Sequence, residues 1–258
     1  MGAFDRIWQP IDPGTGSTIA WPAGWRVHHC AETGSTNTDL LASFARGEAG
    51  DRWVLATDHQ TAGRGRLDRR WEAPAGTNLL VSLLFTEVPD PAVELTHRVG
   101  LAAVRAASCA GGAGAVSLKW PNDVLLGDRK LAGILAQRAS GGPTSVAAEA
   151  VVVGMGMNVR WAPEGAARLG EGVAPARVLS ELLAAFDALP ARIGDHYRSA
   201  LSTLGQAVHV ELPGGGHLEG IAEDVDERGR LVLRDAEGTS HRLDVGDIVH
   251  ARRAGRGG

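Results

Sequence analysis

The chain has 258 residues, a net charge of −4 at neutral pH, 44% hydrophobic and 22% charged residues, and a pI near 6.1. This composition predicts a globular protein and argues against a general nucleic-acid binder, which usually carries a strongly basic domain. Two cysteines, Cys30 and Cys109, exclude a disulfide framework and favour a cytoplasmic protein. No signal peptide and no apolar run of membrane-spanning length is present, so we expect no membrane association.

The first predicted elements are an arm, a strand and a helix. Residues 1–25, rich in Gly, Pro and Trp, predict an irregular arm with room for one short helix. Residues 27–33 predict a strand. Thr36 or Asn37 can cap the helix that follows, and Gly47 is of the residue type that commonly ends a helix.

Two strands and a second helix come next, with a long loop between the strands. Residues 53–58 predict a strand, and the continuous apolar run NLLVSLLF at 78–85 predicts a strand buried on both faces. Residues 61–76 between them predict a loop rich in Gly and Arg. Residues 91–110 have helical periodicity, with Pro91 near the first turn.

The remainder of the first domain mixes strands and helices. Residues 176–204 are helical in pattern, with a break near Pro190. Further strands are predicted at residues 115–120, 123–127, 130–138 and 145–159.

The pattern changes at Gly205. Residues 206–253 predict five short alternating strands separated by turns, which is typical of a small SH3-like barrel. We therefore expect an α/β domain with a mixed sheet over residues 1–204, a small β-domain over 205–253, and a disordered tail over 254–258.

The loop TAGRGRLDRRW alternates glycine with Arg64 and Arg66 and continues with Arg69 and Arg70. Glycines let backbone N–H groups approach an anion, and arginine binds phosphate or carboxylate through two hydrogen bonds. A solvated basic loop or an RNA-contacting tract is the alternative. The position between two buried strands favours a ligand site, because α/β domains place ligands at such sheet-edge loops.

The string GSTNTD contains Ser35, Thr36 and Asn37. It is either a plain helix cap or a set of hydroxyl and amide groups that hold a neutral polar ligand at a helix start.

The stretch KWPNDVLLGDRKLAG holds Lys119 and Lys130, the only two lysines among 26 basic residues. Pro121 interrupts a strand pattern, so Asn122 and Asp123 are expected where the backbone turns. There Asp123 caps the turn, orients a basic group or helps to hold magnesium. Lys130 is either an exposed hairpin lysine or a compact ammonium that follows a phosphate through a reaction.

In this order, GSTNTD, DHQTAGRGR, NLLVSLLF, KWPNDVLL, RKLAGIL and GMGMNV resemble the biotin protein ligases. The resemblance is strong over residues 30–160 and continues more weakly to the small β-domain, which is similar to the family's SH3-like C-terminal domain. It implies a mixed-sheet catalytic domain of the class II synthetase type. It also implies ATP and biotin as substrates, Mg²⁺, formation of biotinyl-5′-AMP, and transfer of biotin to a lysine of a biotin carboxyl carrier domain.

The resemblance also implies roles for residues. The biotin site would contain Ser35, Thr36, Asn37, Gln60, Gly63, Arg64, Gly65, Arg66 and Lys130. The ATP and adenylate site would contain Arg66, Trp71, Asn122, Asp123, Lys130 and Asn158. Lys130 and Arg66 would be catalytic, Asp123 would help to bind Mg²⁺, and Lys119 would support them.

The chain departs from the family pattern in two ways. Asp68 stands where the family loop usually has a glycine, which puts the loop's closing motion in doubt. About thirty residues precede the first motif, too few for the helix-turn-helix domain of bifunctional relatives, so we expect no DNA binding. We further expect a monomer or weak homodimer.

Three alternatives remain open on the sequence. A lipoate or octanoate ligase or transferase would share the fold. A nucleic-acid-binding protein would use the Arg-rich loop and the barrel, but the acidic pI and scarce Tyr and Phe count against it. A non-catalytic scaffold would have no reason to combine GRGR with KWPND.

Overall fold

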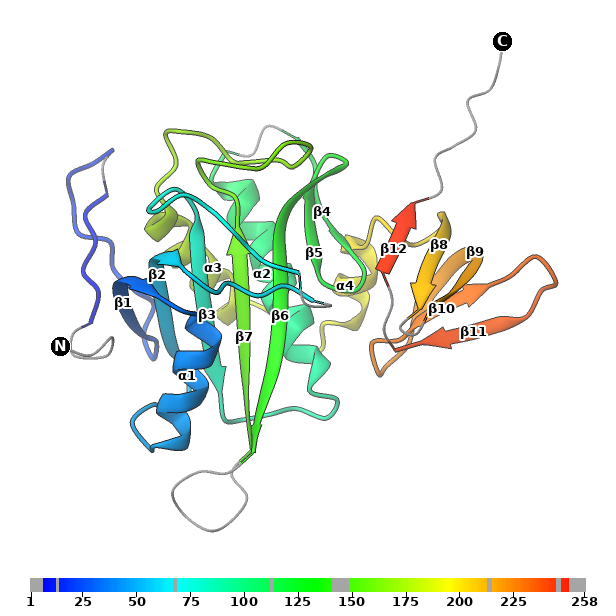
Figure 1. Cartoon of the computed structure of the whole chain (residues 1–258), viewed down its shortest axis with the longest axis horizontal. Helices are drawn as coiled ribbons and strands as arrows, with labels where there is room; N and C mark the ends of the chain where they lie inside the picture. Colours follow the sequence, from blue (N-terminus) through cyan, green and yellow to red (C-terminus); the bar gives the residue numbers. More distant parts are fainter. Residues whose placement is uncertain are drawn as a thin grey trace.

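Two sheets organise the protein, one seven-stranded and mixed, the other five-stranded and antiparallel (Figure 1). The computed structural model describes residues 7–12, 14–66, 69–111, 114–140, 149–212, 215–244 and the backbone of 247–250. The expectations for Asp68 and for the tail at 254–258 fall outside the described residues.

The larger sheet has the strand order β1-β2-β3-β7-β6-β5-β4. Only β1 and β2 are parallel, and every other neighbouring pair is antiparallel. The strands are β1 (Arg26–Thr33), β2 (Trp53–Gln60), β3 (Leu79–Phe85), β4 (Val116–Lys119), β5 (Asp123–Leu126), β6 (Arg129–Ser140) and β7 (Glu149–Met157).

Helices cover both faces of this sheet. On one face, α1 (Thr36–Ala45) packs Leu40 and Phe44 against β2, β3 and β7. On the other, α2 (Val93–Cys109) and α3 (Pro175–Asp187) enclose the larger core, and α4 (Gly194–Ala200) follows (Figure 1). All seven residues of β3 are buried, as its apolar run predicts, because both of its faces are covered.

The C-terminal sheet has the order β11-β10-β9-β8-β12. Its strands are β8 (Ala207–Leu212), β9 (Gly216–Val225), β10 (Leu231–Arg234), β11 (Ser240–Leu243) and β12 (Asp247–His250), which confirms the five predicted strands. It contacts the larger unit where the buried Trp120 donates a hydrogen bond from Nε1 to the carbonyl of Gly229 at 3.0 Å.

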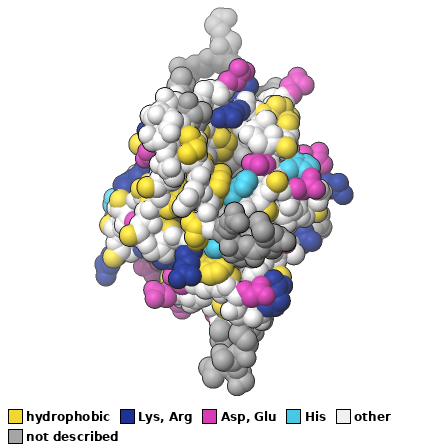
Figure 2. Space-filling model, turned by 90° about the vertical axis from the view of Figure 1, so that its left-hand side faces the viewer, with side chains coloured by type: hydrophobic (Ala, Val, Ile, Leu, Met, Phe, Trp, Pro, Cys, Tyr) yellow, Lys and Arg dark blue, Asp and Glu magenta, His cyan; other side chains and the backbone are white. Residues whose placement is uncertain are grey.

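The N-terminal arm follows the outer edge of β1. In its described part it forms no helix, but Ile7 pairs with His28 and Ile11 with Thr18 as isolated bridges. Figure 2 shows this side of the molecule, where hydrophobic side chains gather; Ile7 and Ile11 are 46% and 59% exposed.

Other details correct or confirm the predictions. The N-cap of α1 is Ser35, not Thr36 or Asn37, which instead occupy the first helical turn and are buried. The predicted helix at 176–204 divides into α3 and α4 around Pro190, as expected. Within the described residues, no helix is long and apolar enough to span a bilayer.

Candidate active site

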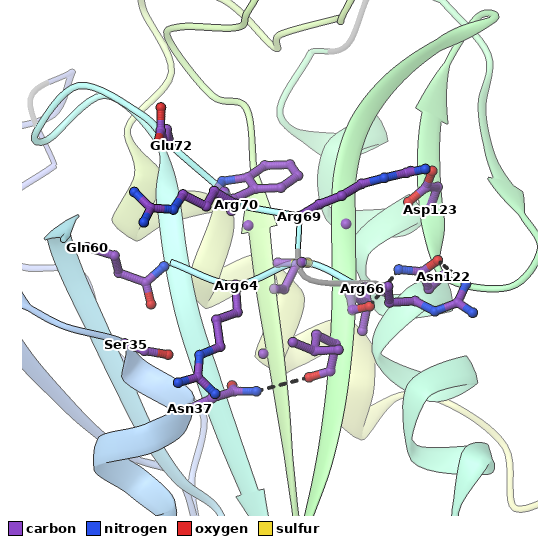
Figure 3. Close-up of a pocket in the computed structure, with 18 of the residues that line it drawn as sticks. Ser35, Asn37, Gln60, Arg64, Arg66, Arg69, Arg70, Glu72, Asn122 and Asp123 are labelled. Carbon is purple, nitrogen blue, oxygen red and sulfur yellow. Dashed lines mark hydrogen bonds between the residues drawn. The ribbon is translucent and has the colours of Figure 1, made fainter. Parts of the chain in front are cut away.

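A pocket of about 260 Å³ opens on the sheet face that carries α1 (Figure 3). The loop after β2 covers it, and β6 and β7 form its floor. Its lining includes Ser35, Thr36, Asn37, Gln60, Arg64, Gly65, Arg66, Arg69, Arg70, Trp71, Glu72, Asn122, Asp123, Lys130, Gly133, Gly154, Gly156 and Asn158.

One end of the pocket carries hydroxyl and amide groups held in place by hydrogen bonds, and Arg64 points towards it (Figure 3). The Thr36 backbone N–H donates to Oε1 of Gln60 at 2.9 Å. The Asn37 amide donates to Oε1 of Gln137 at 2.8 Å. Beneath them, the fully buried Ser82 Oγ lies 2.6 Å from Asn37 Oδ1 and 2.7 Å from Thr36 Oγ1. This network fixes hydroxyl and amide groups in place before any ligand arrives.

Glycines of β6 and β7 make room for two of the lining side chains. A Cβ atom on Gly154 would lie 2.2 Å from Asn37 Oδ1, and one on Gly156 would lie 2.4 Å from Cε2 and Nε1 of Trp71. A Cβ on Gly133 of β6 would lie 3.1 Å from the same indole. Any larger residue at Gly154 or Gly156 would therefore displace Asn37 or Trp71.

A β-bulge turns Lys130 towards the pocket. In the β5–β6 pair, Leu125 is opposite Lys130 while Val124 is opposite Ala132, so Leu131 is the extra residue. Strict alternation would place Lys130 with Ala132, on the face covered by α2. Instead, Leu131 is fully buried in the core, and Lys130 Nζ lies 3.3 Å from the position of a Cβ on Gly133, on the pocket face.

The other end of the pocket is strongly cationic. Arg66, Arg69 and Lys130 lie here beside the carboxylate of Asp123, whereas Arg64 points towards Asn37 and Arg70 towards the side of Gln60 (Figure 3). In a protein whose net charge is −4, this local excess of positive charge marks a site for an anion.

Two contacts organise the cationic end. Lys130 Nζ lies 2.7 Å from Asp123 Oδ1. Arg66 donates to Asn122 Oδ1 at 3.2 Å (Figure 3). Asn122 in turn donates from Nδ2 to the carbonyl of Ile134 at 2.8 Å, which fixes the β4–β5 turn against β6.

Asn158 follows β7 and is buried at the same pocket. Its Nδ2 donates to the carbonyl of Ala167 at 3.0 Å, and its Oδ1 accepts from Asn78 at 3.3 Å. Asn78 also accepts from the backbone N–H of Val159 at 3.0 Å. These bonds hold the segment after β7 over the pocket rim.

Of the residues that the sequence assigned to the biotin and ATP sites, all but Gly63 line this pocket. Gly63 lies beside it, where a Cβ would come 2.4 Å from the Trp71 carbonyl oxygen. Lys119 is opposite Asp123 in the β4–β5 pair, so it lies on the same sheet face without lining the pocket.

Sequence reasoning missed Ser82, Gln137 and the glycines of the floor. Ser82 had a signal, since it is the only hydroxyl residue in the run NLLVSLLF. The alternating glycines of GMGM were a second signal, because glycine in a strand often marks close approach by another group.

Two family models match the chain. The Biotin/lipoate A/B protein ligase family matches residues 31–158, and the Biotin protein ligase C terminal domain matches residues 203–251. A biotin--[acetyl-CoA-carboxylase] ligase of Mycobacterium tuberculosis is 39% identical, over 96% of this chain and 98% of that protein. The enzyme of that name from Paracoccus denitrificans is 34% identical, over 81% and 94%. The chain therefore belongs to the biotin protein ligases, within the biotin/lipoate ligase family.

Solved structures have the same fold. The biotin protein ligase of Aquifex aeolicus in complex with biotin and ATP superimposes with a TM-score of 0.70 at 24% identity, over 87% of this chain and 99% of that one. The Leishmania major enzyme in complex with biotinyl-5-AMP gives a TM-score of 0.60 at 24% identity, over 85% and 98%.

Proposed function

We propose that the protein attaches biotin to a carrier protein in two steps within this one pocket. In the first step biotin and ATP give biotinyl-5′-AMP and pyrophosphate. In the second, a lysine amine of a biotin carboxyl carrier domain attacks the activated carbonyl, and AMP leaves. The observation that carries this proposal is the continuous lining, with hydroxyl and amide groups at one end and Arg66, Arg69 and Lys130 at the other (Figure 3).

Biotin matches the end with the hydroxyl and amide groups chemically. Its ureido group has donors and acceptors but no charge, and Ser35, Thr36, Asn37 and Gln60 offer complementary hydroxyl and amide groups. Gly63 and Gly65 let the loop backbone pass close above the ligand. The biotin carboxylate would then extend towards the cationic end.

The first step joins two anions, which is why the cations matter. A biotin carboxylate oxygen bonds to the α-phosphorus of ATP as the bond from that phosphorus to the pyrophosphate oxygen breaks. Lys130 and Arg66 would offset the repulsion between these anions and the charge on the phosphoryl oxygens in the transition state. Fixed positions for both side chains mean that little reorganisation is needed when charge moves.

The nucleotide would lie across the other residues of the pocket. Trp71 offers an indole face for the adenine ring, and Asn158 an amide for its edge. Asp123 fits a magnesium ion, because Mg²⁺ in nucleotide sites is held by one or two carboxylates together with phosphate oxygens. Such an ion would supply further positive charge beside the phosphates.

The named relatives make the carrier domain of acetyl-CoA carboxylase the natural acceptor to test. Biotin carboxyl carrier domains present one lysine to the ligase, so the acceptor amine would enter the pocket once pyrophosphate has left.

The decisive experiment offers the protein Mg-ATP together with biotin, lipoate or octanoate and detects the acyl-adenylate by mass spectrometry. We expect biotinyl-5′-AMP as the only acyl-adenylate. When a carrier domain is added, we expect transfer of biotin to its lysine. Absence of biotinyl-5′-AMP would overturn the proposal, and formation of lipoyl-AMP or octanoyl-AMP instead would assign the pocket to the lipoate ligases.

A further inference from the structure

A second cluster of chemically active side chains lies on the C-terminal sheet, away from the active site. Among the described residues, one group of three potential metal ligands is present: His209 on β8, with His217 and Glu219 on β9. Figure 1 shows these two strands on the part of the molecule opposite α1 and the N-terminal arm.

The strand register gathers the cluster on one face. His209 is opposite Glu219, and His217 is opposite Glu211. Side chains two residues apart share a face of a strand, so all four project from the same side of the hairpin. Val210, between the two β8 positions, is fully buried on the other side, which makes the cluster face the outer one.

The distances suit a small metal ion. The two imidazole rings are stacked with centroids 4.6 Å apart and planes inclined by 20°. His209 Nδ1 lies 3.0 Å from Glu219 Oε1, and one ligand atom from each of the three residues lies within 4.8 Å of the others. A tetrahedral ion with bonds of about 2.0–2.2 Å separates its ligand atoms by about 3.3–3.6 Å. Modest side-chain rotations would therefore close the cluster around it.

The ligand atoms of the cluster can be reached from solvent. The side chains of His209 and Glu219 are 30% and 72% exposed, which leaves the ligand atoms open to an ion from solution.

We propose that His209, His217 and Glu219 bind one Zn²⁺ ion, with Glu211 or a water molecule at the fourth position. Two imidazoles and a carboxylate favour zinc over magnesium, which prefers oxygen ligands alone. The bound ion links β8 to β9 and so stabilises the C-terminal sheet without touching the biotin pocket.

The chain supplies a matched control. His59 Nδ1 lies 2.9 Å from Glu32 Oε2 across β1 and β2, a cross-strand His–Glu contact of the same kind. Among the described residues, this pair is not part of a group of three potential ligands. It therefore should not hold zinc firmly.

The test is a calorimetric titration of tag-free, chelator-treated full-length protein with ZnCl₂ in the absence of nucleotide. We expect one Zn²⁺ per chain for the unmodified protein and for His59→Ala, and affinity at least tenfold weaker for His217→Ala and for Glu219→Gln. Co²⁺ should give the visible absorption of a tetrahedral complex, and His217→Ala should abolish it.

Because His217 and Glu219 are exposed, these variants should fold normally, as circular dichroism will check. Zinc should raise the melting temperature of the unmodified protein and leave that of His217→Ala unchanged. The proposal is overturned if the unmodified protein takes up no zinc, or if His59→Ala abolishes uptake while His217→Ala does not. Biotin activation is not measured, so neither result depends on the ligase function.

Discussion

Lys130 Nζ lies 2.7 Å from Asp123 Oδ1 across the β5–β6 pair, because the bulge at Leu131 brings both side chains to the same face of the sheet. This pairing places the ammonium group at the cationic end of the pocket and keeps it partly exposed to an incoming anion. The ion pair is too exposed to contribute much to stability. We therefore expect Lys130 to act mainly on the reaction.

Lys130→Ala should lower the rate of biotinyl-5′-AMP formation by about 100- to 1000-fold, as expected when a group that stabilises transition-state charge is removed. Lys130→Arg should also lose most of the activity, since the planar guanidinium does not replace a compact ammonium at a tight site. Single-turnover measurement of the adenylate tests both. Arg129→Ala, at the exposed neighbouring cation, is the control and should keep its rate. Normal turnover by Lys130→Arg would contradict the assigned role.

The two glycines of β7 should separate biotin binding from ATP binding. Gly154→Ala forces Asn37 to move and should raise KM for biotin at least tenfold, whereas Gly156→Ala displaces Trp71 and should raise KM for ATP. Gly172→Ala, which adds a methyl group in open space, should change neither constant. Equal effects of both strand variants on both substrates would show that the two ends are not independent.

Ser82 should matter for both stability and biotin affinity. Ser82→Ala removes the buried hydroxyl between Thr36 and Asn37, and the polar groups left behind should lower the free energy of unfolding by about 1–3 kcal/mol. Biotin titration should show weaker binding in parallel. Ser180→Ala removes a hydroxyl that donates to the Ala20 carbonyl at the surface, where water can replace it, and should cost no more than about 0.5 kcal/mol. A Ser82→Ala protein of full stability and affinity would refute the positioning role.

Acid should weaken the protein through His97. Burial lowers the pKa of His97 from 6.5 to about 4. The imidazole is stacked on Tyr197 and lies against Gly229 of the C-terminal unit. Because the unfolded chain takes up this proton below about pH 6.5 and the folded protein only near pH 4, stability should fall as the pH decreases between these values.

The loss through His97 should reach about 2 kcal/mol by pH 4.5. Urea unfolding at pH 7 and pH 4.5 measures it. His97→Phe should show a smaller loss between these two pH values, whereas the exposed His196→Ala should behave like the unmodified protein. An unchanged pH dependence in His97→Phe would assign the acid sensitivity to other groups.

Local patterns in the sequence were enough to predict the architecture. The buried run of β3, the helical periodicity of α2 and the turn signals of the last fifty or so residues each depend on neighbours in the chain, and each was confirmed. The motif residues of the pocket could also be named, because their order along the chain resembles that of a known family.

What the linear pattern could not supply is the side to which each residue points and what it touches. Period-two alternation puts Lys130 on the wrong face, and only the pairing of β6 with β5 shows the bulge that reverses it. Likewise, the sequence alone indicated Thr36 and Asn37 as possible helix caps. In the structure Ser82, far away in the chain, hydrogen-bonds to both side chains, and Gly154 leaves room for Asn37.

The sequence by itself therefore determined the elements, the family and the chemical types present at the site. The tertiary structure alone decided which side chains share the pocket, why glycine is required on its floor, and that two histidines meet a glutamate on the outer face of β8 and β9. The physical reason is that these relationships arise from strand register and close packing between distant segments, which no local periodicity encodes.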